Sequence, residues 1–547
     1  MDEARRRLLA ALGTTGVAAV AGCIEGRNRG ANPYTPDQRT RTGETETSTT
    51  VTPTATLTPT QSPTAPADTT SPAKTTDRPD TPPPTATTDP AGTPPPATTT
   101  DPASTCSPAT ATDAPASSRR VDKLRAENPG GRDVFGTSIA ISDDASTAII
   151  GAAQDEDPNG RFEAGSGGGS AHVFEQSDGA WSRAAKLAAD DGDAEDNFGW
   201  TVAVSGDGST AIVGASMDED PNGVRGGSVY AFGQSDGGWT QQAKLVADDG
   251  DKQDHFGSSV ALSNDGSTLV VGAVDDEDPN GSSGEYDGAG SAHVFEESDG
   301  AWNRVAKLAT DDGEGVDEFG FSAALANGGS TAIIGAWGDD NANGRGAGSA
   351  YVFEESGSGW HQAAKLVADD GGDDDRFGWS IAVSDDGATA VIGASRDEDP
   401  NGVGAGSAYV FSRSDGAWRQ ETKLAPDDVN NGAEFGFSVA VSGGGSTSVI
   451  GAVDADTALG EHAGAAYVFE ASDGGWGQGA TLVADDGDRG DGLGDSVAVT
   501  NDGRTAMVGA YWDDEPDWAC AESHEAPAGD GAGSVYVFEP PDGGWSQ

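Results

Sequence analysis

Five short segments of the chain carry oxygen-bearing side chains at alternate positions, a spacing suited to binding a metal ion. Four segments read Asp-Glu-Asp-Pro-Asn-Gly and the fifth reads Asp-Asp-Asn-Ala-Asn-Gly. Carboxylate and amide oxygens at positions one, three and five, followed by a turn glycine, match the first half of a calcium-binding loop. Calcium is therefore a candidate cofactor, and the alternative is a set of solvated acidic turns on a salt-adapted surface. The candidate ligands are Asp155, Asp157, Asn159, Asp218, Asp220, Asn222, Asp276, Asp278, Asn280, Asp339, Asn341, Asn343, Asp397, Asp399 and Asn401.

A second acidic run lies between these segments. One copy reads Asp190-Asp191-Gly192-Asp193 and is followed by Asp196. We interpret these runs as connecting loops, with cation binding as the alternative.

The side chains that most often catalyse reactions follow no repeated pattern. The six histidines fall at different positions, except that His172 and His293 both stand where other copies of the repeat have tyrosine. We interpret this pair as packing or edge residues of a strand. The sequence contains no nucleophile elbow, Walker loop or His-Glu-x-x-His motif. We therefore expect a protein that is not an enzyme and has no catalytic residues.

The elements that position these segments are repeated seven times after residue 119. The dipeptide Phe-Gly marks six copies, and the successive spacings are 63, 58, 63, 58, 58 and 58 residues when Leu493-Gly494 is counted as a divergent seventh. Self-similarity at this period indicates a repeat architecture. The six Phe-Gly copies begin at Phe135, Phe198, Phe256, Phe319, Phe377 and Phe435.

Each copy contains four candidate strands. In the second copy these are residues 201–205, 210–215, 228–232 and 239–245, and Asp-Gly turns separate the first from the second and the third from the fourth. Asp-Gly between alternating apolar runs is a strong hairpin signal. A lone four-stranded sheet cannot bury two apolar faces, but neighbouring sheets in a ring can. We therefore predict an all-β, seven-bladed β-propeller of four-stranded antiparallel blades.

The two ends of the repeated region are predicted to complete one blade together. Residues 543–547 match the beginning of a fourth strand, and residues 120–124 match its end. A linear array would instead leave edge strands exposed, which favours aggregation.

The order Phe-Gly, Ser-Val-Ala-Val-Ser, Val-Gly-Ala and Gly-Ser-Ala-Tyr-Val-Phe resembles the FG-GAP repeat family, which includes the propeller of integrin α chains. The resemblance covers roughly residues 120–547 and implies a propeller fold, often on a cell surface. In integrin-like repeats a further Asp follows the turn glycine by three residues. The equivalents here are Glu163, Gly226, Gly284, Ala347 and Ala405, so the final calcium ligand is mostly lost.

The first 118 residues read as an export signal followed by a spacer. Arg5-Arg6-Arg7, a short apolar stretch and Val20-Ala21-Gly22-Cys23 resemble a twin-arginine signal ending in a lipobox. We predict a signal at residues 1–23 with lipidation at Cys23, a disordered Thr/Pro/Ala/Ser-rich stalk at 24–118 and the propeller at 119–547. Sugar attached to the stalk is compatible with its composition.

The net charge of the chain limits the classes of molecule that can bind to it. It has 91 acidic and 31 basic side chains and a net charge of −60. Such a charge repels nucleic acid and anionic lipid. It also resembles the acidic surfaces of haloarchaeal proteins, and a membrane contact is expected only through the lipid anchor.

The connection between the second and third strands is longest in the seventh copy. This insert and the residue before it contain Trp512, Trp518 and Cys520, and insertions on one face of a repeat ring often mark a binding surface. We regard it as the candidate partner-binding loop. An exported protein can hold disulfides, so we also predict a bond between Cys106 and Cys520.

Together these features predict a non-catalytic binding, adhesion or display module, anchored by a lipid to the outer face of the cell membrane. Its partner is an unidentified extracellular protein or glycan. The alternative is a propeller-type hydrolase or lyase that acts on an extracellular substrate in the axial channel.

Overall fold

The computed structural model describes residues 119–127, 132–155, 167–219, 221–235, 238–276, 288–310, 312–313, 316–398, 401–426, 428–513, 531–541 and 544–545. The predicted export signal, stalk, lipidation site and disulfide lie outside these residues. The candidate site residues outside the described ranges, including several candidate calcium ligands, are Cys23, Cys106, Asp157, Asn159, Asp220, Asp278, Asn280, Asp399, Trp518 and Cys520.

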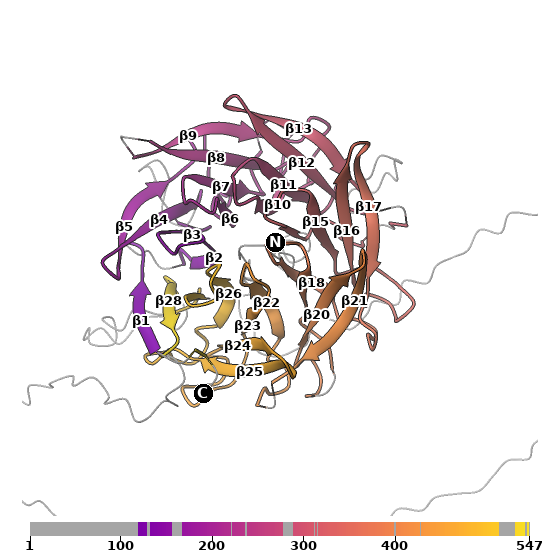
Figure 1. Cartoon of the computed structure of the whole chain (residues 1–547). Helices are drawn as coiled ribbons and strands as arrows, with labels where there is room; N and C mark the ends of the chain where they lie inside the picture. Colours follow the sequence, from indigo (N-terminus) through magenta and orange to yellow (C-terminus); the bar gives the residue numbers. More distant parts are fainter. Residues whose placement is uncertain are drawn as a thin grey trace, which may run out of the picture. The chain divides into compact units, whose positions relative to one another are not determined.

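The described residues form seven four-stranded antiparallel sheets arranged as the blades of a ring (Figure 1). Blades one to six each use four strands that are consecutive in the chain, whereas blade seven is ordered β26, β27, β28 and β1. This confirms the prediction of an all-β, seven-bladed propeller. No helix in the described part of the chain is long and apolar enough to cross a membrane.

The two inner strands of each blade are short and rich in small side chains. The innermost strands are β2 (Phe135–Ile141), β6 (Thr201–Val204), β10 (Phe256–Leu262), β14 (Ser322–Leu325), β18 (Phe377–Val383), β22 (Phe435–Val441) and β26 (Leu493–Val499). The second strands are β3 (Thr147–Ala152), β7 (Thr210–Ala215), β11 (Thr268–Ala273), β15 (Thr331–Ala336), β19 (Thr389–Ala394), β23 (Thr447–Ala452) and β27 (Ala506–Ala510).

In blades one to six the two outer strands are longer, with eight residues each, and carry the larger side chains. The third strands are β4 (Ser170–Ser177), β8 (Ser228–Ser235), β12 (Ser291–Ser298), β16 (Ser349–Ser356), β20 (Ser407–Ser414), β24 (Ala465–Ser472) and β28 (Ser534–Glu539). The outermost strands are β5 (Ala180–Leu187), β9 (Gly238–Leu245), β13 (Ala301–Leu308), β17 (Gly359–Leu366), β21 (Ala417–Leu424), β25 (Gly475–Leu482) and β1 (Arg119–Leu124).

Burial follows the position of each strand in its blade. In blade two every residue of β6 is buried, whereas most side chains of β9 alternate between exposed and half-buried. A strand covered on both faces needs apolar side chains on both, and an outermost strand needs them on one only. The hydrophobic core therefore lies between neighbouring blades.

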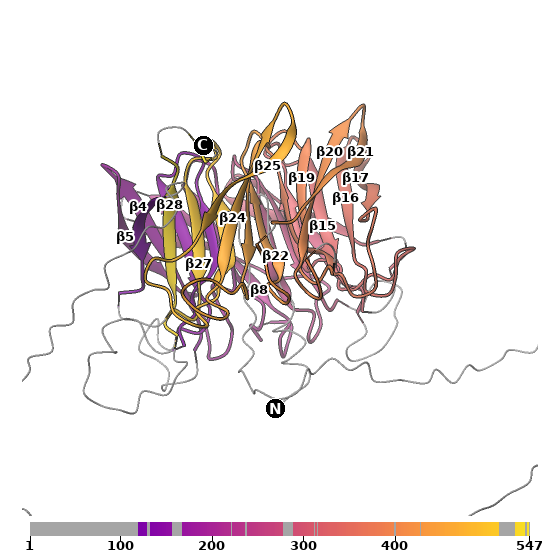
Figure 2. The ribbon, with the colours of Figure 1, turned by 90° about the horizontal axis from the view of Figure 1, so that it is seen from below.

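The ring has two faces, and the strands run from one to the other (Figure 2). One face holds the hairpin turns that join the first strand to the second and the third strand to the fourth. We call it the hairpin face. The opposite face holds the connections between second and third strands and between successive blades, and we call it the loop face. The described residues of all five candidate calcium loops belong to the loop face.

The glycine of Phe-Gly lets neighbouring blades approach closely. Gly199 has a φ of +91°, and a Cβ atom there would overlap the carbonyl oxygen of Ser170 in blade one. A Cβ on Gly151, in the Gly-Ala of β3, would in turn overlap the carbonyl oxygen of Gly199. Because any side chain at either position would push the blades apart, both glycines of the repeat signature are explained by packing.

A hydrogen bond repeats at every blade boundary. The hydroxyl of Ser138, in β2, donates to the carbonyl oxygen of Gly199 in the next blade at 2.9 Å. The equivalent pairs are Thr201 with Gly257, Ser259 with Gly320, Ser322 with Gly378, Ser380 with Gly436, Ser438 with Gly494, and Ser496 with Gly136.

The N-terminal strand β1 and the C-terminal strands complete blade seven together, as predicted, but β1 alone forms the fourth strand and the described residues 544–545 belong to no strand. Strand β1 pairs antiparallel with β28, so that Leu124 lies opposite Val535, and Figure 1 shows the two strands side by side. Trp545 is buried, and its indole N–H donates to the carbonyl oxygen of Gly503 at 2.8 Å. Sheet hydrogen bonds from one end and a buried tryptophan from the other therefore close the ring.

Candidate functional site

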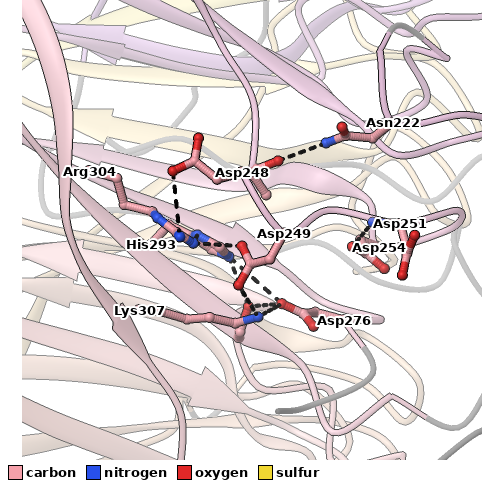
Figure 3. Close-up of polar contacts among 11 residues, drawn as sticks. Asn222, Asp248, Asp249, Asp251, Asp254, Asp276, His293, Arg304 and Lys307 are labelled. Carbon is pink, nitrogen blue, oxygen red and sulfur yellow. Dashed lines mark hydrogen bonds and ion pairs between the residues drawn. The ribbon is translucent and has the colours of Figure 1, made fainter. Parts of the chain in front are cut away.

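Each described first-position aspartate of the candidate calcium loops is buried and paired with a lysine. In blade three, Asp276 follows β11 and its Oδ2 lies 2.7 Å from Nζ of Lys307, near the end of β13 (Figure 3). The same ammonium lies 3.2 Å from Oδ2 of Asp249, in the connection between blades two and three. The Ser291 hydroxyl also donates to Asp276, and Nε2 of His293 lies 3.1 Å from that hydroxyl. We call this arrangement the lysine–aspartate network.

The network recurs around the ring, with tyrosine replacing histidine in several blades. In blade two, Lys244 lies 2.9 Å from Asp218 and 2.7 Å from Asp191, and the Tyr230 hydroxyl donates to Asp218 at 2.6 Å. The other pairs of first-position aspartate, or its blade-seven equivalent, and lysine are Asp155–Lys186 at 2.5 Å, Asp339–Lys365 at 3.0 Å, Asp397–Lys423 at 2.7 Å and Asp513–Lys123 at 2.6 Å.

The opposite charges in the network stabilise the ionised forms of the carboxylates and of the ammonium. Burial alone would raise the pKa of Asp276, but its contacts with His293 and Lys307 hold that pKa at about 2. Burial would lower the pKa of Lys307, and the neighbouring carboxylates raise it instead. Burial lowers the pKa of His293, so this imidazole is neutral near pH 7. The network therefore consists of ionised carboxylates around an ammonium, with neutral hydrogen-bonding side chains beside them.

Blade six has lost both charged partners together. Ala455 stands where the other blades have the first-position aspartate, and Thr481 stands where they have the lysine. Tyr467 remains, and it lies opposite Thr481 in the strand pairing. A buried carboxylate without its ammonium partner, or a buried ammonium without its carboxylate, is strongly destabilising. Absence of both groups leaves no uncompensated charge. Sequence reasoning missed these lysines, although a Lys-Leu at the end of six of the seven outermost strands was the available signal.

The third and fifth positions of the candidate calcium loops are described completely in blade four only. There Asn341 donates to the carbonyl oxygen of Gly348 at 2.7 Å, and Asn343 donates to that of Ala368 at 2.6 Å. Asp339 contacts Lys365 instead, so the three side chains are held by different neighbours. The fifth-position residues Asn222 and Asn401 likewise donate to the carbonyl oxygens of Ala247 and Pro426.

No group of three or more His, Cys, Asp or Glu side chains that could hold a metal ion occurs within the described ranges. In the loops of blades one, two, three and five, at least one candidate ligand lies outside those ranges. Calcium binding there stays a prediction.

The second acidic run forms the turn that leads into each blade. Asp254 is buried, and its carboxylate accepts a 2.7 Å hydrogen bond from the backbone N–H of Asp251, as Figure 3 shows. Burial raises the pKa of Asp254 to about 7, and Asp276 adds to this effect by charge repulsion. Asp196 makes the same turn in blade two and its pKa is likewise about 7. These runs are therefore connections between blades, as interpreted from the sequence.

The axis of the ring is filled near the loop face by aromatic side chains from different blades. Trp200, Phe321, Trp379 and Phe437 each follow the glycine of the repeat signature and pack in one buried cluster with Tyr511. We call these five residues the axial cluster. Side chains from five blades can meet only where the innermost strands converge, which is the axis. Of the predicted partner-binding residues, Trp512 is half-buried against this cluster, and Trp518 lies outside the described residues.

The histidines occupy structural positions in the strands. His172 and His293 are buried in β4 and β12, each about edge-on to the phenylalanine of the repeat signature, Phe135 or Phe256. This confirms their interpretation as packing residues.

A cavity of about 670 Å³ lies on the hairpin face, where blades seven and one meet. Asp143, Asp502 and Glu539 contribute acidic groups to its lining, and Arg504 contributes a basic one. Asp143, which belongs to this lining, also accepts a hydrogen bond from the side-chain amide of Asn264. Sequence reasoning did not identify this cavity, because it forms only when the two ends of the ring meet.

Comparison with known proteins identifies the repeat. The model described as FG-GAP repeat matches residues 119–174, 181–232, 239–295, 302–353, 360–411, 418–469 and 476–538. Each matched unit begins in the outermost strand of one blade and ends in the third strand of the next, as 239–295 runs from β9 to β12. No curated protein matches the chain. Because the matched units cover more than half of it, the chain belongs to the FG-GAP repeat family.

Proposed function

We propose that this protein is a non-catalytic binding, adhesion or display module whose partner contacts the loop face. The observation that carries the proposal is an exposed set of apolar side chains on that face. Val224, Val403 and Leu459 lie in the connections between second and third strands of blades two, five and six, and are 46%, 66% and 39% exposed. Val316, in the connection leading into blade four, is 51% exposed.

These four side chains share one face of the ring, although they belong to different blades. Of the six exposed large apolar side chains in the described residues, four lie on the loop face and two, Val121 and Val305, lie on outermost strands. Exposed apolar groups in the loops of one face of a repeat ring are available to contact a partner. The surrounding acidic groups disfavour nucleic acid as partner. The partner that we propose is therefore an extracellular protein or glycan.

The experiment compares two sets of variants of the full chain coupled to beads. Val224→Asp, Val403→Asp and Leu459→Asp combined alter the loop face, and Val305→Asp is the matched control on an outermost strand. We expect beads carrying the unaltered chain and the control to bind cells of the source organism, and the triple variant to lose this binding. Equal binding by the triple variant and the unaltered chain would contradict the proposal.

Anchoring by lipid is part of the proposal and is supported by the signal and lipobox pattern that ends at Cys23. The acidic composition supports a high-salt environment outside the cell. Replacing Cys23 by Ser is expected to release the protein from the membrane fraction into the medium, without changing its folded propeller. Retention of the variant in the membrane fraction would contradict lipid anchoring.

The hydrolase or lyase alternative has one observation in its favour. Nδ1 of His255 lies 2.8 Å from Oδ2 of Asp275, near the axis on the loop face. A carboxylate in this position orients an imidazole for proton transfer. Nε2 of His255 is buried and has no hydrogen-bond partner within the described ranges, so no nucleophile is joined to it there. The binding function is therefore the one that the geometry supports best.

A further inference from the structure

Side chains of neighbouring third strands meet across two blade boundaries on the hairpin face. The side-chain amide of Gln234, in β8, donates to Oε1 of Glu175, in β4, at 2.8 Å. Arg413, in β20, forms an ion pair with Glu354, in β16. In both pairs the glutamate is the sixth residue of its strand, and its partner is the seventh residue of the third strand in the next blade.

The boundary of blades seven and one has residues at the same two positions but no contact between them. Glu539 is the sixth residue of β28 and Gln176 is the seventh residue of β4, and both line the cavity of about 670 Å³. Neither side chain forms a hydrogen bond or ion pair within the described ranges. Strand β28 ends at Glu539, whereas the third strands of the other blades continue for two more residues. The cavity therefore lies beside a shorter blade edge.

One residue of the cavity lining differs in chemistry from its six equivalents. Arg504 lies in the turn between the first and second strands of blade seven, and its backbone N–H donates to Asp502 at 3.0 Å. Its guanidinium has no hydrogen bond or ion pair in the part of the chain that the structure describes. The equivalents in blades one to six are Ser146, Ser209, Ser267, Ser330, Ala388 and Ser446. The repeat therefore gains a guanidinium at the cavity and at no equivalent position.

The three side chains without partners include both hydrogen-bond donors and acceptors. The guanidinium of Arg504 only donates, the ionised carboxylate of Glu539 only accepts, and the carboxamide of Gln176 does both. An anionic ligand would be repelled by the acidic side chains of the lining, which include Asp144 and Asp502. A simple cation would leave the guanidinium without a partner. The hydroxyls of an uncharged saccharide each donate and accept, so a saccharide can match all three groups.

We propose that the cavity between blades seven and one binds an uncharged saccharide, with Arg504, Gln176 and Glu539 as its hydrogen-bonding side chains. The cavity volume falls within the range of about 300–1,000 Å³ that is typical of small-ligand sites. The cavity lies on the hairpin face, whereas the proposed partner surface lies on the loop face. The saccharide site is therefore separate from that surface and does not depend on it.

The test prints oligosaccharides on one array and probes them with the fluorescently labelled full chain in high salt. The neutral set contains oligomers of glucose, of galactose and of mannose, and the charged sets contain oligomers of glucuronic acid and of glucosamine. We expect binding to at least one neutral oligosaccharide, and the free oligosaccharide of the same structure should displace it. Binding to the charged sets only, or to no sugar, would overturn the proposal.

A variant then assigns the binding to the cavity. Arg504→Ser introduces the side chain that five other blades have at this position, so the variant should fold. Losing hydrogen bonds from a charged donor should weaken saccharide binding by about tenfold or more.

Arg419→Ser is the matched control for this substitution. It removes the same charge from an exposed position of β21, where the guanidinium donates to Ser414 at 2.9 Å. The control should bind saccharide as the unaltered chain does. An Arg504→Ser protein that binds saccharide as tightly as the control would place the site elsewhere and overturn the proposal.

The loop-face triple variant separates this proposal from the proposed function. Val224→Asp, Val403→Asp and Leu459→Asp combined should abolish cell binding but leave saccharide binding unchanged, because the cavity lies on the opposite face. Loss of saccharide binding in the triple variant, but not in Arg504→Ser, would assign the sugar to the loop face and overturn the proposal.

Discussion

The hydroxyl of Ser496 donates a 2.6 Å hydrogen bond to the carbonyl oxygen of Gly136, which lies 360 residues earlier in the chain. An equivalent hydrogen bond joins each of the six remaining pairs of neighbouring blades, and its two residues are 56 or 61 positions apart in the chain. Blade seven and blade one therefore meet through the same contact as blades that are consecutive in the chain. The ring is closed because the same hydrogen bond forms at all seven blade boundaries.

Close packing at the blade boundary predicts a large effect for Gly199→Ala. The added Cβ would overlap the carbonyl oxygen of Ser170, and the residue also has a positive φ. We expect a loss of about 2 to 4 kcal/mol in the free energy of unfolding, measured by chemical denaturation in high salt.

Gly179→Ala is the control for this substitution. Gly179 has a φ of +78°, and a Cβ atom added there would meet nothing within 4 Å, so only the backbone conformation is strained. It should cost about 1 kcal/mol. Equal losses for the two variants would show that blade packing is not the reason for the glycine of the repeat signature.

The lysine–aspartate network predicts a non-additive pair of substitutions in blade two. Lys244→Thr leaves Asp218 buried without its cation, and Asp218→Ala leaves the ammonium of Lys244 with one carboxylate fewer. Each should cost about 1 to 3 kcal/mol, less than a fully buried pair because the Lys244 side chain is 20% exposed.

The double variant reproduces the residues that blade six has naturally. It should be less destabilised than the sum of the two single variants, by an interaction energy of about 0.5 to 3 kcal/mol. Chemical denaturation of all four proteins measures this energy. An additive double variant would contradict the interpretation that blade six lost both charges together for a physical reason.

The buried carboxylates Asp196 and Asp254 make a contribution to stability that falls as pH rises from about 4 to 7. Burial raises the pKa values of Asp196 and Asp254 to about 7, above the ordinary value of 3.8, so the folded state binds more protons than the unfolded state in this range. Ionising these groups in the folded state therefore lowers the free energy of unfolding.

The double variant Asp196→Asn and Asp254→Asn should flatten this slope. Asn keeps an oxygen that can accept the turn hydrogen bond, but it cannot ionise. Thermal unfolding midpoints between pH 4.5 and 8, at constant high salt, give the comparison. A variant with the same slope as the unaltered protein would exclude these two groups as the cause.

The calcium hypothesis predicts a rise in the unfolding midpoint that depends on calcium itself. Calcium chloride should stabilise the protein more than magnesium chloride at the same ionic strength, in both low and high salt. The variant Asp339→Asn tests the loop of blade four, where the carboxylate already contacts Lys365. Absence of a calcium-specific rise would remove the metal interpretation and leave salt-adapted turns.

A disulfide between Cys106 and Cys520 predicts a change in mass on reduction. The oxidised mature protein should gain two hydrogen atoms, and alkylation should label both cysteines only after reduction. The variant Cys520→Ser is the control, because it cannot form this bond. Two free thiols in the mature protein before reduction would contradict the prediction.

The strands, the number of blades and the composite blade seven could all be predicted from the amino-acid sequence. Phe-Gly, the Asp-Gly turns and the Val-Gly-Ala segments recur at constant offsets, and each has a local cause in turn geometry or in the need to omit a Cβ atom. Local causes can be identified from a sequence because they act over a few residues. The histidines of β4 and β12 were placed correctly for the same reason.

Which charged groups meet could be learned only from the folded ring. Asp218 and Lys244 are 26 residues apart, and Asp191 comes from the connection preceding their blade, yet one ammonium contacts both carboxylates. Electrostatic partners depend on distances across the ring, and these are set by how the blades pack rather than by spacing along the chain.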